Sequence, residues 1–482
     1  MTIDLRNLAS FGDVAAEDDS VLEYFLSTNA VKQIEQDEAF LVLGRKGSGK
    51  TAIVRFFTES PQQGFSKALN LRGYPWNVHA LRVDCGASDA EAYVASWRYL
   101  ISVQMASLAI KARASQNHSQ AKSIKRFFAD NYGEAEPGLK DILRPPRLKL
   151  GRLSFMPAIM GNQLGGVDLN RSDSNLGFGR ELDAVSSALL DASIALCKDT
   201  GISRLMLHID ELDQGLSELD EKRSKMIIGL ILAAREIRRD SRKKGACIAP
   251  IVYLRSDLWS ELEFSDKNKI SQTQTLHLEW SPEALHSMVE ARLTAQLGPK
   301  ATWETIAEAD LMRGSQTKWN HIVSRTFLRP RDVIRFLNAA LVSAKSRSDS
   351  PLVFTNKDII AARDPYSAYL KAELDDEILT HWRQWGDALK ACSSISTLTF
   401  KREQFAAEYT KRQTKEPLLS DSDALRLLYQ FSVLGYEKRS GYGGSSWVFQ
   451  YTDPEVGWDS SATRFKIHLG LKEYARLREE RK

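Results

Sequence analysis

The sequence predicts an α/β fold in which helices cover both faces of a parallel sheet. Short apolar runs alternate with longer helical patterns, one run leads through a glycine-rich turn into a helix, and another ends in two adjacent acids. Strands that alternate with helices need crossover connections, which make them parallel. We expect strands at residues 39–43, 78–84, 204–210, 248–254 and 275–280. We expect the helices between and after them at about 50–59, 90–113, 181–198, 219–241 and 282–297.

The composition of the 482 residues is that of an ordinary globular protein, with 43% hydrophobic and 27% charged residues. These values exclude whole-chain disorder, collagen and coiled coil. No window approaches 18 uninterrupted apolar residues, so we expect no membrane partner. The acidic N-terminal region lacks the features of a signal peptide, and the four cysteines include no CxxC pair, so a reducing cytoplasm is the expected location.

A phosphate-binding loop of the form GxxxxGK[ST] follows the first strand. Its residues are Gly44, Arg45, Lys46, Gly47, Ser48, Gly49, Lys50 and Thr51. The glycines let backbone N–H groups face an anion, and the following helix adds its positive N-terminal end. Lys50 is placed to reach the β- and γ-phosphates, and Thr51 to ligate Mg²⁺. The loop therefore predicts binding of ATP with Mg²⁺.

The strand at 204–210 ends in the acidic pair Asp210 and Glu211. A carboxylate at the end of a neighbouring strand is needed to hold the metal, and Asp210 supplies it. Glu211 is placed to orient or deprotonate an attacking water. The pair predicts ATP hydrolysis, which could be slow. An acid directly after the metal-binding Asp indicates the additional-strand class, in which a further strand lies between the two motifs. Asp213 is as well explained by a helix cap.

Two arginines are candidates for sensing the γ-phosphate. Arg255 follows the strand at 248–254, whose tip should point at that phosphate, and a guanidinium can bind it bidentately. Arg331 begins a helical lid element at 333–343 and could reach back to the nucleotide. Alternatively, Arg255 is a surface residue that begins a loop. The alternative for Arg331 is that it pairs with Asp332 or faces solvent.

A long insertion separates the two motifs, because Lys50 and Asp210 are too far apart for a compact core. Residues 105–180 hold twelve basic and six acidic residues, and we place the insertion at about 115–180. It predicts a helix followed by a β-hairpin or a mobile loop. Contact with a partner, with nucleic acid or with another protomer is one reading, and inert or disordered surface is the other.

The C-terminal part has helical patterns at 366–391, 402–411 and 421–431, followed by a two-stranded ribbon. This is the order of a winged helix. Lys438, Arg439 and Tyr442 lie near the wing and could contact a phosphate backbone. Acidic residues in the helix at 421–431 disfavour reading of the major groove, so packing or protein contact is the preferred interpretation.

The motifs together resemble those of AAA+-related P-loop ATPases of the origin-recognition type and their STAND and KAP cousins, a family that includes many bacterial ATPases. The matching segments are Gly44–Thr51, Leu205–Glu211, Tyr253–Asp257 and Leu328–Asp332. We expect a P-loop ATPase core of the additional-strand class over 1–298, a helical lid over 299–356 and a winged-helix-like domain over 357–482. Lys50, Glu211, Arg255 and Arg331 are the expected catalytic residues.

Three functions fit this organisation. The first is an Mg-ATPase that does conformational work, and the second is a nucleotide-dependent switch for a protein partner or for self-association. The third, an alternative to both, is a winged-helix DNA-binding regulator gated by ATP. Nucleic acid therefore stays a possible partner. The resemblance also implies that the relatives include loaders and ATPases that defend against phage or other mobile DNA.

Overall fold

The computed structural model describes residues 3–60, 65–72, 74, 89–112, 117–133, 137–143, 174–212, 220–412, 419–439 and 444–479. The chain forms two compact units. The sheet unit consists of residues 27–45 and 50–278, and the helical unit of residues 1–26, 46–49 and 279–482. The domain boundaries at 298/299 and 356/357 stay predictions. Among the described helices, none has the length and apolar character that crossing a membrane requires.

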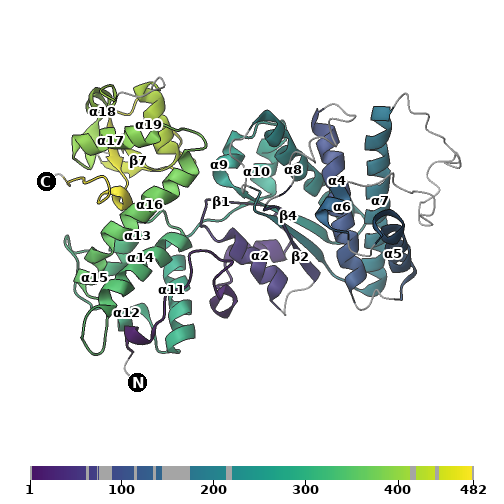
Figure 1. Cartoon of the computed structure of the whole chain (residues 1–482), viewed down its shortest axis with the longest axis horizontal. Coiled ribbons are helices and arrows are strands. Elements are labelled where there is room, and N and C mark those ends of the chain that lie inside the picture. Colours follow the sequence, from purple (N-terminus) through teal and green to yellow (C-terminus); the bar gives the residue numbers. More distant parts are fainter. Residues whose placement is uncertain are drawn as a thin grey trace. The chain divides into compact units, whose positions relative to one another are not determined.

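The sheet unit is built on a five-stranded parallel sheet in the order β2-β3-β4-β1-β5 (Figure 1). The strands are β1 (Leu41–Gly44), β2 (Phe65–Asn70), β3 (Leu205–Asp210), β4 (Ile248–Arg255) and β5 (Thr275–His277). The predicted parallel α/β sheet is therefore confirmed. β4 pairs with both β1 and β3, so an additional strand separates the strand before the glycine loop from the strand before the acidic pair.

β2, which lies at the edge of the sheet among the described residues, was not expected. The strand predicted at 78–84 lies outside the described residues, and the place beside β3 belongs to residues 65–70. Only Leu69 of β2 is more than nine-tenths buried, at 4% exposure. An edge strand with one covered side chain needs no apolar run, which explains why the pattern of the sequence did not indicate it.

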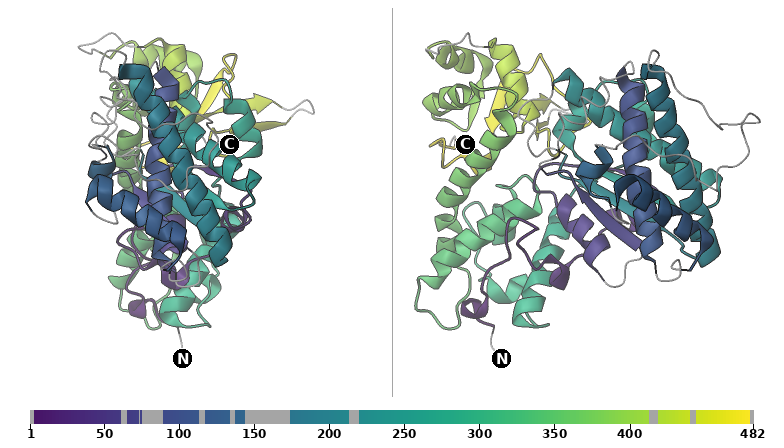
Figure 2. Two further views of the ribbon diagram at one scale, coloured as in Figure 1. Left: turned by 90° about the vertical axis from the view of Figure 1, so that its right-hand side faces the viewer. Right: turned by 45° about the vertical axis from the view of Figure 1, so that its right-hand side comes forward.

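Helices cover both faces of this sheet (Figure 1). α2 (Lys50–Glu59) packs on one face, and α4 (Asp89–Lys111) and α8 (Glu221–Lys243) on the other. The Asp220 side chain accepts from the Arg223 N–H and caps the start of α8. α4 also packs along α7 (Ser174–Thr200), as the views in Figure 2 show. Because α4 has neighbours on several sides, it is apolar around most of its surface.

The remaining described helices of the sheet unit are shorter than α4, α7 and α8. They are α1 (Asn29–Glu35), α5 (Ser119–Tyr132), α6 (Leu139–Leu143), α9 (Ser256–Glu261) and α10 (Lys267–Thr273). α5 and α6 belong to the predicted insertion, and the helix expected there is present. The basic stretch and most of the hairpin or loop expected after it fall within 144–173, outside the described residues. The end of that expected loop, residues 174–180, is instead helical, because α7 begins at Ser174.

The helical unit has its own hydrophobic core. Its helices up to residue 378 are η1 (Leu5–Asn7), η2 (Val21–Tyr24), α11 (Pro282–Leu297), α12 (Trp303–Ile306), α13 (Lys318–Val323), α14 (Pro330–Lys345), α15 (Asn356–Ala361) and α16 (Arg363–Ile378). The N-terminal segment joins this core through specific contacts. The Leu5 N–H donates to the Leu352 carbonyl at 3.0 Å, and Arg292 pairs with Asp19 at 3.0 Å, both side chains being 5% exposed.

The C-terminal part of the helical unit carries a second sheet. Its elements are α17 (Trp385–Ile395), β6 (Thr399–Lys401), α18 (Arg402–Tyr409), α19 (Asp421–Gln430), β7 (Leu434–Arg439), β8 (Ser445–Val448), β9 (Arg464–Ile467) and η4 (Leu469–Leu471). The strands form an antiparallel sheet in the order β6-β9-β7-β8, so the expected two-stranded ribbon is part of a larger sheet. The helical pattern at 366–391 is divided between α16 and α17.

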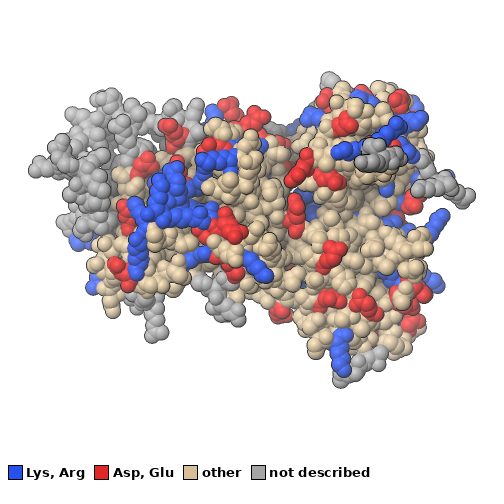
Figure 3. Space-filling model, turned by 180° about the vertical axis from the view of Figure 1, so that it is seen from behind, with Lys and Arg blue, Asp and Glu red and all other residues tan. Residues whose placement is uncertain are grey.

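The surface carries charges of both signs. The net charge of the chain is +4. Figure 3 shows basic and acidic side chains interspersed over one face, and the larger basic group on it has acidic neighbours. This mixture is what a solvated surface requires.

Candidate functional site

The glycine loop between β1 and α2 turns where the sequence places its glycines. Gly47 has φ 80° and Gly49 has φ 99°, in a region that side chains with a Cβ rarely adopt. A Cβ at Gly47 would also lie 2.9 Å from the Cβ of Arg331. Both the backbone conformation and the close approach therefore require glycine at position 47.

The lysine and the hydroxyl of the loop are positioned by the start of α2 in the sheet unit. The Lys50 ammonium donates to the carbonyls of Gly44 at 2.8 Å and Arg45 at 3.2 Å. The Thr51 hydroxyl donates to the Oδ2 of Asp210 at 2.9 Å. The structure thus brings together Thr51 and Asp210, which are 159 residues apart. Hydroxyl and carboxylate oxygens are the hard ligands that Mg²⁺ prefers, so this pair fits the predicted metal.

Glu211 occupies an unusual backbone position directly after β3. Its φ is 60°, in the left-handed region that non-glycine residues rarely adopt. The residue is 5% exposed, and both of its carboxylate oxygens are buried. Strained, buried polar residues at the carboxyl end of a parallel strand occur typically at functional sites. Asp213, the weaker candidate, lies outside the described residues.

Arg255 lies at the same edge of the sheet. It is the register partner of Gly44, the first residue of the loop. Its guanidinium forms a two-pronged pair with Asp257, at 3.0 Å from Nε and 2.5 Å from Nη2, and its side chain is 12% exposed. Asp257 thus holds Arg255 beside the loop in a fixed orientation.

Arg331 is not paired with Asp332, the partner that one reading gave it. Its Nη1 lies 3.2 Å from Oε2 of Glu373 on α16, and its Nε donates to the Val14 carbonyl at 3.1 Å. The partner of Asp332 is Arg329, which binds its two oxygens at 2.9 and 3.0 Å. The sequence motif therefore contains two arginines with different tasks.

Arg329 is a residue of the site that the sequence did not indicate. Its side chain is 2% exposed, and its Nη1 donates to Glu377 at 2.8 Å and to the carbonyl of Lys46 at 2.9 Å. Burial alone lowers the pKa of Arg329, but the carboxylates of Asp332 and Glu377 outweigh burial and raise the pKa above its ordinary value. An arginine this deeply buried is charged and acts as a structural clamp on the loop backbone.

The middle of the glycine loop, residues 46–49, belongs to the helical unit. The Lys46 ammonium lies 3.4 Å from Glu373 and 2.9 Å from Asp376, and the Trp280 indole donates to the Ser48 carbonyl at 2.8 Å. No local pattern could have indicated these contacts, because their partners are hundreds of residues away in sequence. They tie the loop to α16 and to the segment that precedes α11.

His208, in the middle of β3, is a packing residue. Its Nδ1 lies 2.9 Å from the Tyr253 hydroxyl, and its ring stacks on Phe57 at 5.0 Å. Burial lowers the pKa of His208 to about 3, so the ring is neutral near pH 7.

The chain matches two kinds of known sequence. A family model described as the FunZ-associated C-terminal helical domain matches residues 283–375. This segment runs from the start of α11 into α16 and includes Arg329, Arg331 and Glu373. The chain is also 23% identical over 494 residues to a protein of Escherichia coli (strain K12) named as a transposon gamma-delta 80.3 kDa protein. That match covers 96% of this chain and 66% of the relative, so the chain spans just under two thirds of the relative's length.

The solved structures that resemble the chain are distant from it. The Walker-type ATPase of Pyrococcus abyssi has a TM-score of 0.39 and 12% identity, covering 93% of this chain and 99% of that one. The ORC1 protein of Aeropyrum pernix, solved in complex with DNA, has a TM-score of 0.36 and 10% identity, covering 93% and 91%. Cdc6p of Pyrobaculum aerophilum has a TM-score of 0.32 and 11% identity, covering 95% and 97%. Similarity this low does not describe the site, so the site is described from the residues of this chain alone. These are a glycine loop, a lysine and a hydroxyl at the start of a helix, and an acidic pair at the end of a strand.

Proposed function

We propose that the chain binds ATP with Mg²⁺ and hydrolyses it. The observation that carries this proposal is the 2.9 Å contact between the Thr51 hydroxyl and Asp210, made in the same unit in which Lys50 lies over the start of the loop. A cation bound by a hydroxyl and a carboxylate, next to an ammonium and a turn of glycines, suits a polyphosphate rather than a neutral or cationic ligand.

Each side chain has a defined task in this reaction. The loop N–H groups and the Lys50 ammonium bind and orient the phosphates, and Thr51 and Asp210 hold the metal. When bound, Mg²⁺ supplies positive charge that offsets the charge of the phosphates. Glu211 orients a water and accepts its proton, and Arg255 is the candidate to contact the γ-phosphate.

The proposed use of this reaction is a switch or motor for a protein partner or for self-association. The contacts of Lys46 and Ser48 in the helical unit support it, because they give the loop a direct connection to α16 and Trp280. The relative is named for a transposon. We therefore extend the proposal to a role that concerns mobile DNA. This includes the defence role that the family resemblance implies.

Replacement of Lys50 tests the nucleotide site. We expect Lys50→Ala to weaken binding of the non-hydrolysable analogue AMPPNP by about 10- to 100-fold, because a charge-assisted contact to phosphate is lost. Isothermal titration calorimetry in the presence of Mg²⁺ measures the effect. Lys32→Ala, at an exposed position of α1, is the matched control and should bind as the wild type does. Equal affinity of the Lys50→Ala variant and the wild type would contradict the assignment.

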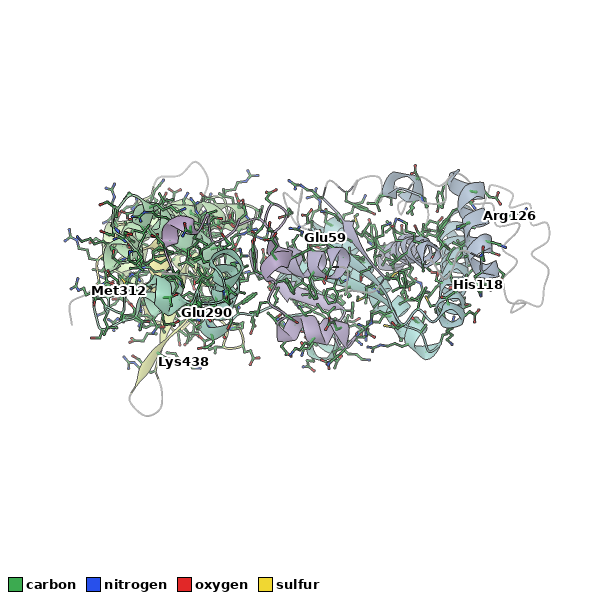
Figure 4. All side chains as sticks on the ribbon, turned by 90° about the horizontal axis from the view of Figure 1, so that it is seen from below. Glu59, His118, Arg126, Glu290, Met312 and Lys438 are labelled. Carbon is green, nitrogen blue, oxygen red and sulfur yellow. The ribbon has the colours of Figure 1, made fainter. Side chains whose placement is uncertain are left out.

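DNA binding by the C-terminal sheet is the second candidate. α17, β6, α18, α19, β7 and β8 follow one another in the winged-helix order, and the β7–β8 hairpin projects with Lys438 near its tip (Figure 4). On the same sheet Trp447 has two cations over its ring, Arg464 at 5.9 Å and Lys466 at 5.6 Å. Cations around a half-buried aromatic side chain suit a phosphate backbone. Tyr442, expected near the wing, lies outside the described residues.

Removal of the hairpin cations tests this candidate. We expect the double variant Lys438→Ala, Arg439→Ala to bind a 30-base-pair duplex about 10-fold more weakly at low salt. The slope of log affinity against log salt concentration should become shallower by about two, because about two fewer counterions are released. Fluorescence anisotropy at several salt concentrations measures both quantities. Lys390→Ala, with a side chain that is 69% exposed, is the control for loss of an unrelated charge. Undetectable binding of the duplex by the wild type at low salt would end this candidate.

A further inference from the structure

Three side chains that can ligate a metal ion come together within the helical unit. One ring nitrogen of His286 and one carboxylate oxygen each of Glu290 and Glu304 lie within 4.8 Å of one another (Glu290 is labelled in Figure 4). His286 and Glu290 belong to α11 and Glu304 to α12, so the cluster joins two helices. All three residues lie in the segment 283–375 that matches the family model, and none belongs to the proposed nucleotide site.

The local sequence places these side chains together. His286 and Glu290 are four residues apart on α11, a spacing that puts two side chains on the same face of a helix, one turn apart. A capping box between Thr302 and Thr305 starts α12, and Glu304 lies in the first turn of that helix. Two ligands from one helix face and a third from the next helix along the chain thus converge without any long-range connection.

Buried tryptophans hold the cluster in position. The imidazole of His286 packs edge-on against the ring of Trp319, with ring centroids 5.0 Å apart and an interplanar angle of 90°. The same ring lies 5.5 Å from that of Trp303, the residue before Glu304. Both indoles are at most 8% exposed. One packed ring therefore orients His286 and also anchors the helix that carries Glu304, and such support is what the ligands of a metal site need.

Ion pairing within the cluster does not account for its charge. His286 Nδ1 lies 3.9 Å from Oε2 of Glu290, and His286 Nε2 lies 3.7 Å from Oε1 of Glu304, both too long for hydrogen bonds. Among the residues that the structure describes, neither glutamate pairs with a lysine or an arginine. Two carboxylates beside one imidazole therefore attract a further cation.

The spacing of the three atoms suits a small ion. Nitrogen and oxygen ligands lie about 2.0–2.2 Å from a tetrahedral Zn²⁺ and so roughly 3.3–3.6 Å from one another. Atoms that lie within 4.8 Å of one another reach this spacing when they approach by about 1 Å. The Glu304 side chain is 70% exposed and is free to make such a rotation, whereas His286 and Glu290 are 25% and 35% exposed.

We propose that His286, Glu290 and Glu304 bind one divalent transition-metal ion of the zinc class. The imidazole favours such an ion over Mg²⁺ and Ca²⁺, which prefer ligand sets made of oxygen. Three protein ligands leave a fourth tetrahedral position for water. The bound ion joins α11 to α12 and stabilises the folded helical unit, because it binds the folded chain and not the unfolded one. This site does not depend on the proposed nucleotide chemistry.

Calorimetric titration of the metal-free full chain with Zn²⁺, in the absence of nucleotide, tests the proposal. We expect His286→Ala and Glu290→Gln each to bind this ion at least about 10-fold more weakly than the wild type, because changes to the supporting residues of a metal site already cost that much. Cobalt(II) in place of zinc should give the visible absorption of a tetrahedral site in the wild type. The absence of a thiolate band would show that no cysteine ligates the ion.

The matched control is His118→Asn. The side chain of His118 is also 25% exposed, but it faces a single carboxylate, that of Asp199 at 3.1 Å. His118 caps α5 by accepting the Gln120 N–H at 3.3 Å, and asparagine can replace it as a cap. This variant should therefore bind Zn²⁺ and Co²⁺ as the wild type does.

Thermal unfolding supplies the second measurement. Zn²⁺ should raise the unfolding midpoint of the wild type and of His118→Asn, and it should not raise the midpoint of His286→Ala or Glu290→Gln. Unfolding in the presence of EDTA shows whether each variant is folded, and Glu290→Gln decides the test if His286→Ala is not. Equal Zn²⁺ affinity of the wild type and the folded variants would refute the site, and so would a wild type that binds no Zn²⁺.

Discussion

Glu211→Gln is expected to reduce steady-state ATP turnover by about 100- to 10,000-fold, the range that a general base contributes. Glutamine has the shape of glutamate but cannot accept a proton from water. The variant keeps Lys50, Thr51 and Asp210, so its affinity for AMPPNP should stay within about two-fold of the wild type. Release of phosphate measures turnover, and calorimetry measures affinity.

The control for this prediction is Glu221→Gln. Glu221 begins α8, and its side chain is 84% exposed and pairs with Lys225 within the same helix. Its replacement should leave turnover unchanged. Hydrolysis by Glu211→Gln at the wild-type rate would show that another group accepts the proton, and the strained backbone at residue 211 would then need a different explanation.

Arg329→Met is expected to have the largest effect on stability. Methionine fills a similar volume but leaves the carboxylates of Asp332 and Glu377, which are 0% and 7% exposed, without their cation. Removal of one partner from a buried ion pair costs about 3–5 kcal/mol of unfolding free energy. Urea unfolding, followed by tryptophan fluorescence, measures the change. Arg329→Lys should lose less, because it keeps the charge and loses only the planar set of donors.

The matched control is Arg335→Met on an exposed position of the same helix, α14. Arg335 lies over the Tyr369 ring at 5.3 Å, a contact whose loss costs about 1 kcal/mol or less at a solvent-exposed site. Similar unfolding midpoints for the variants at 329 and 335 would show that the two carboxylates find other partners or take up protons.

The sequence predicts those parts of the fold in which local pattern and tertiary environment agree. β1, β3 and β4 are covered on both faces, and each reads as an apolar run. The expected ranges for α2 and α11 equal the observed ones, because a glycine loop starts the first and Ser281 and Pro282 start the second. The contact between Thr51 and Asp210 also follows from the order of the strands.

The parts that could not be predicted depend on contacts between distant residues. β2 has no apolar run, and in the part of the chain that the structure describes it lies at the edge of its sheet. Arg329 looks like a surface residue in the sequence, and it is buried only because Asp332 and Glu377 surround it. Lys46 and Glu373 each lie in a stretch of sequence that resembles a solvent-exposed surface. The periodicity of the sequence does not distinguish such an ion pair from two solvated side chains. Short strands such as β6 and β9 likewise take their structure from partners far along the chain.

The helical unit has a consequence for the order in which the chain folds. Leu5 bonds to Leu352 and Asp19 pairs with Arg292, so the N-terminal segment has to wait for partners that are synthesised hundreds of residues later. At about 5–20 residues per second, this delay is on the order of tens of seconds. The sheet unit can acquire most of its contacts in that interval, since β4 and β5 are complete by residue 277. The sheet unit can therefore be largely assembled before the helical unit closes its contact between Leu5 and Leu352, a slow step of high contact order.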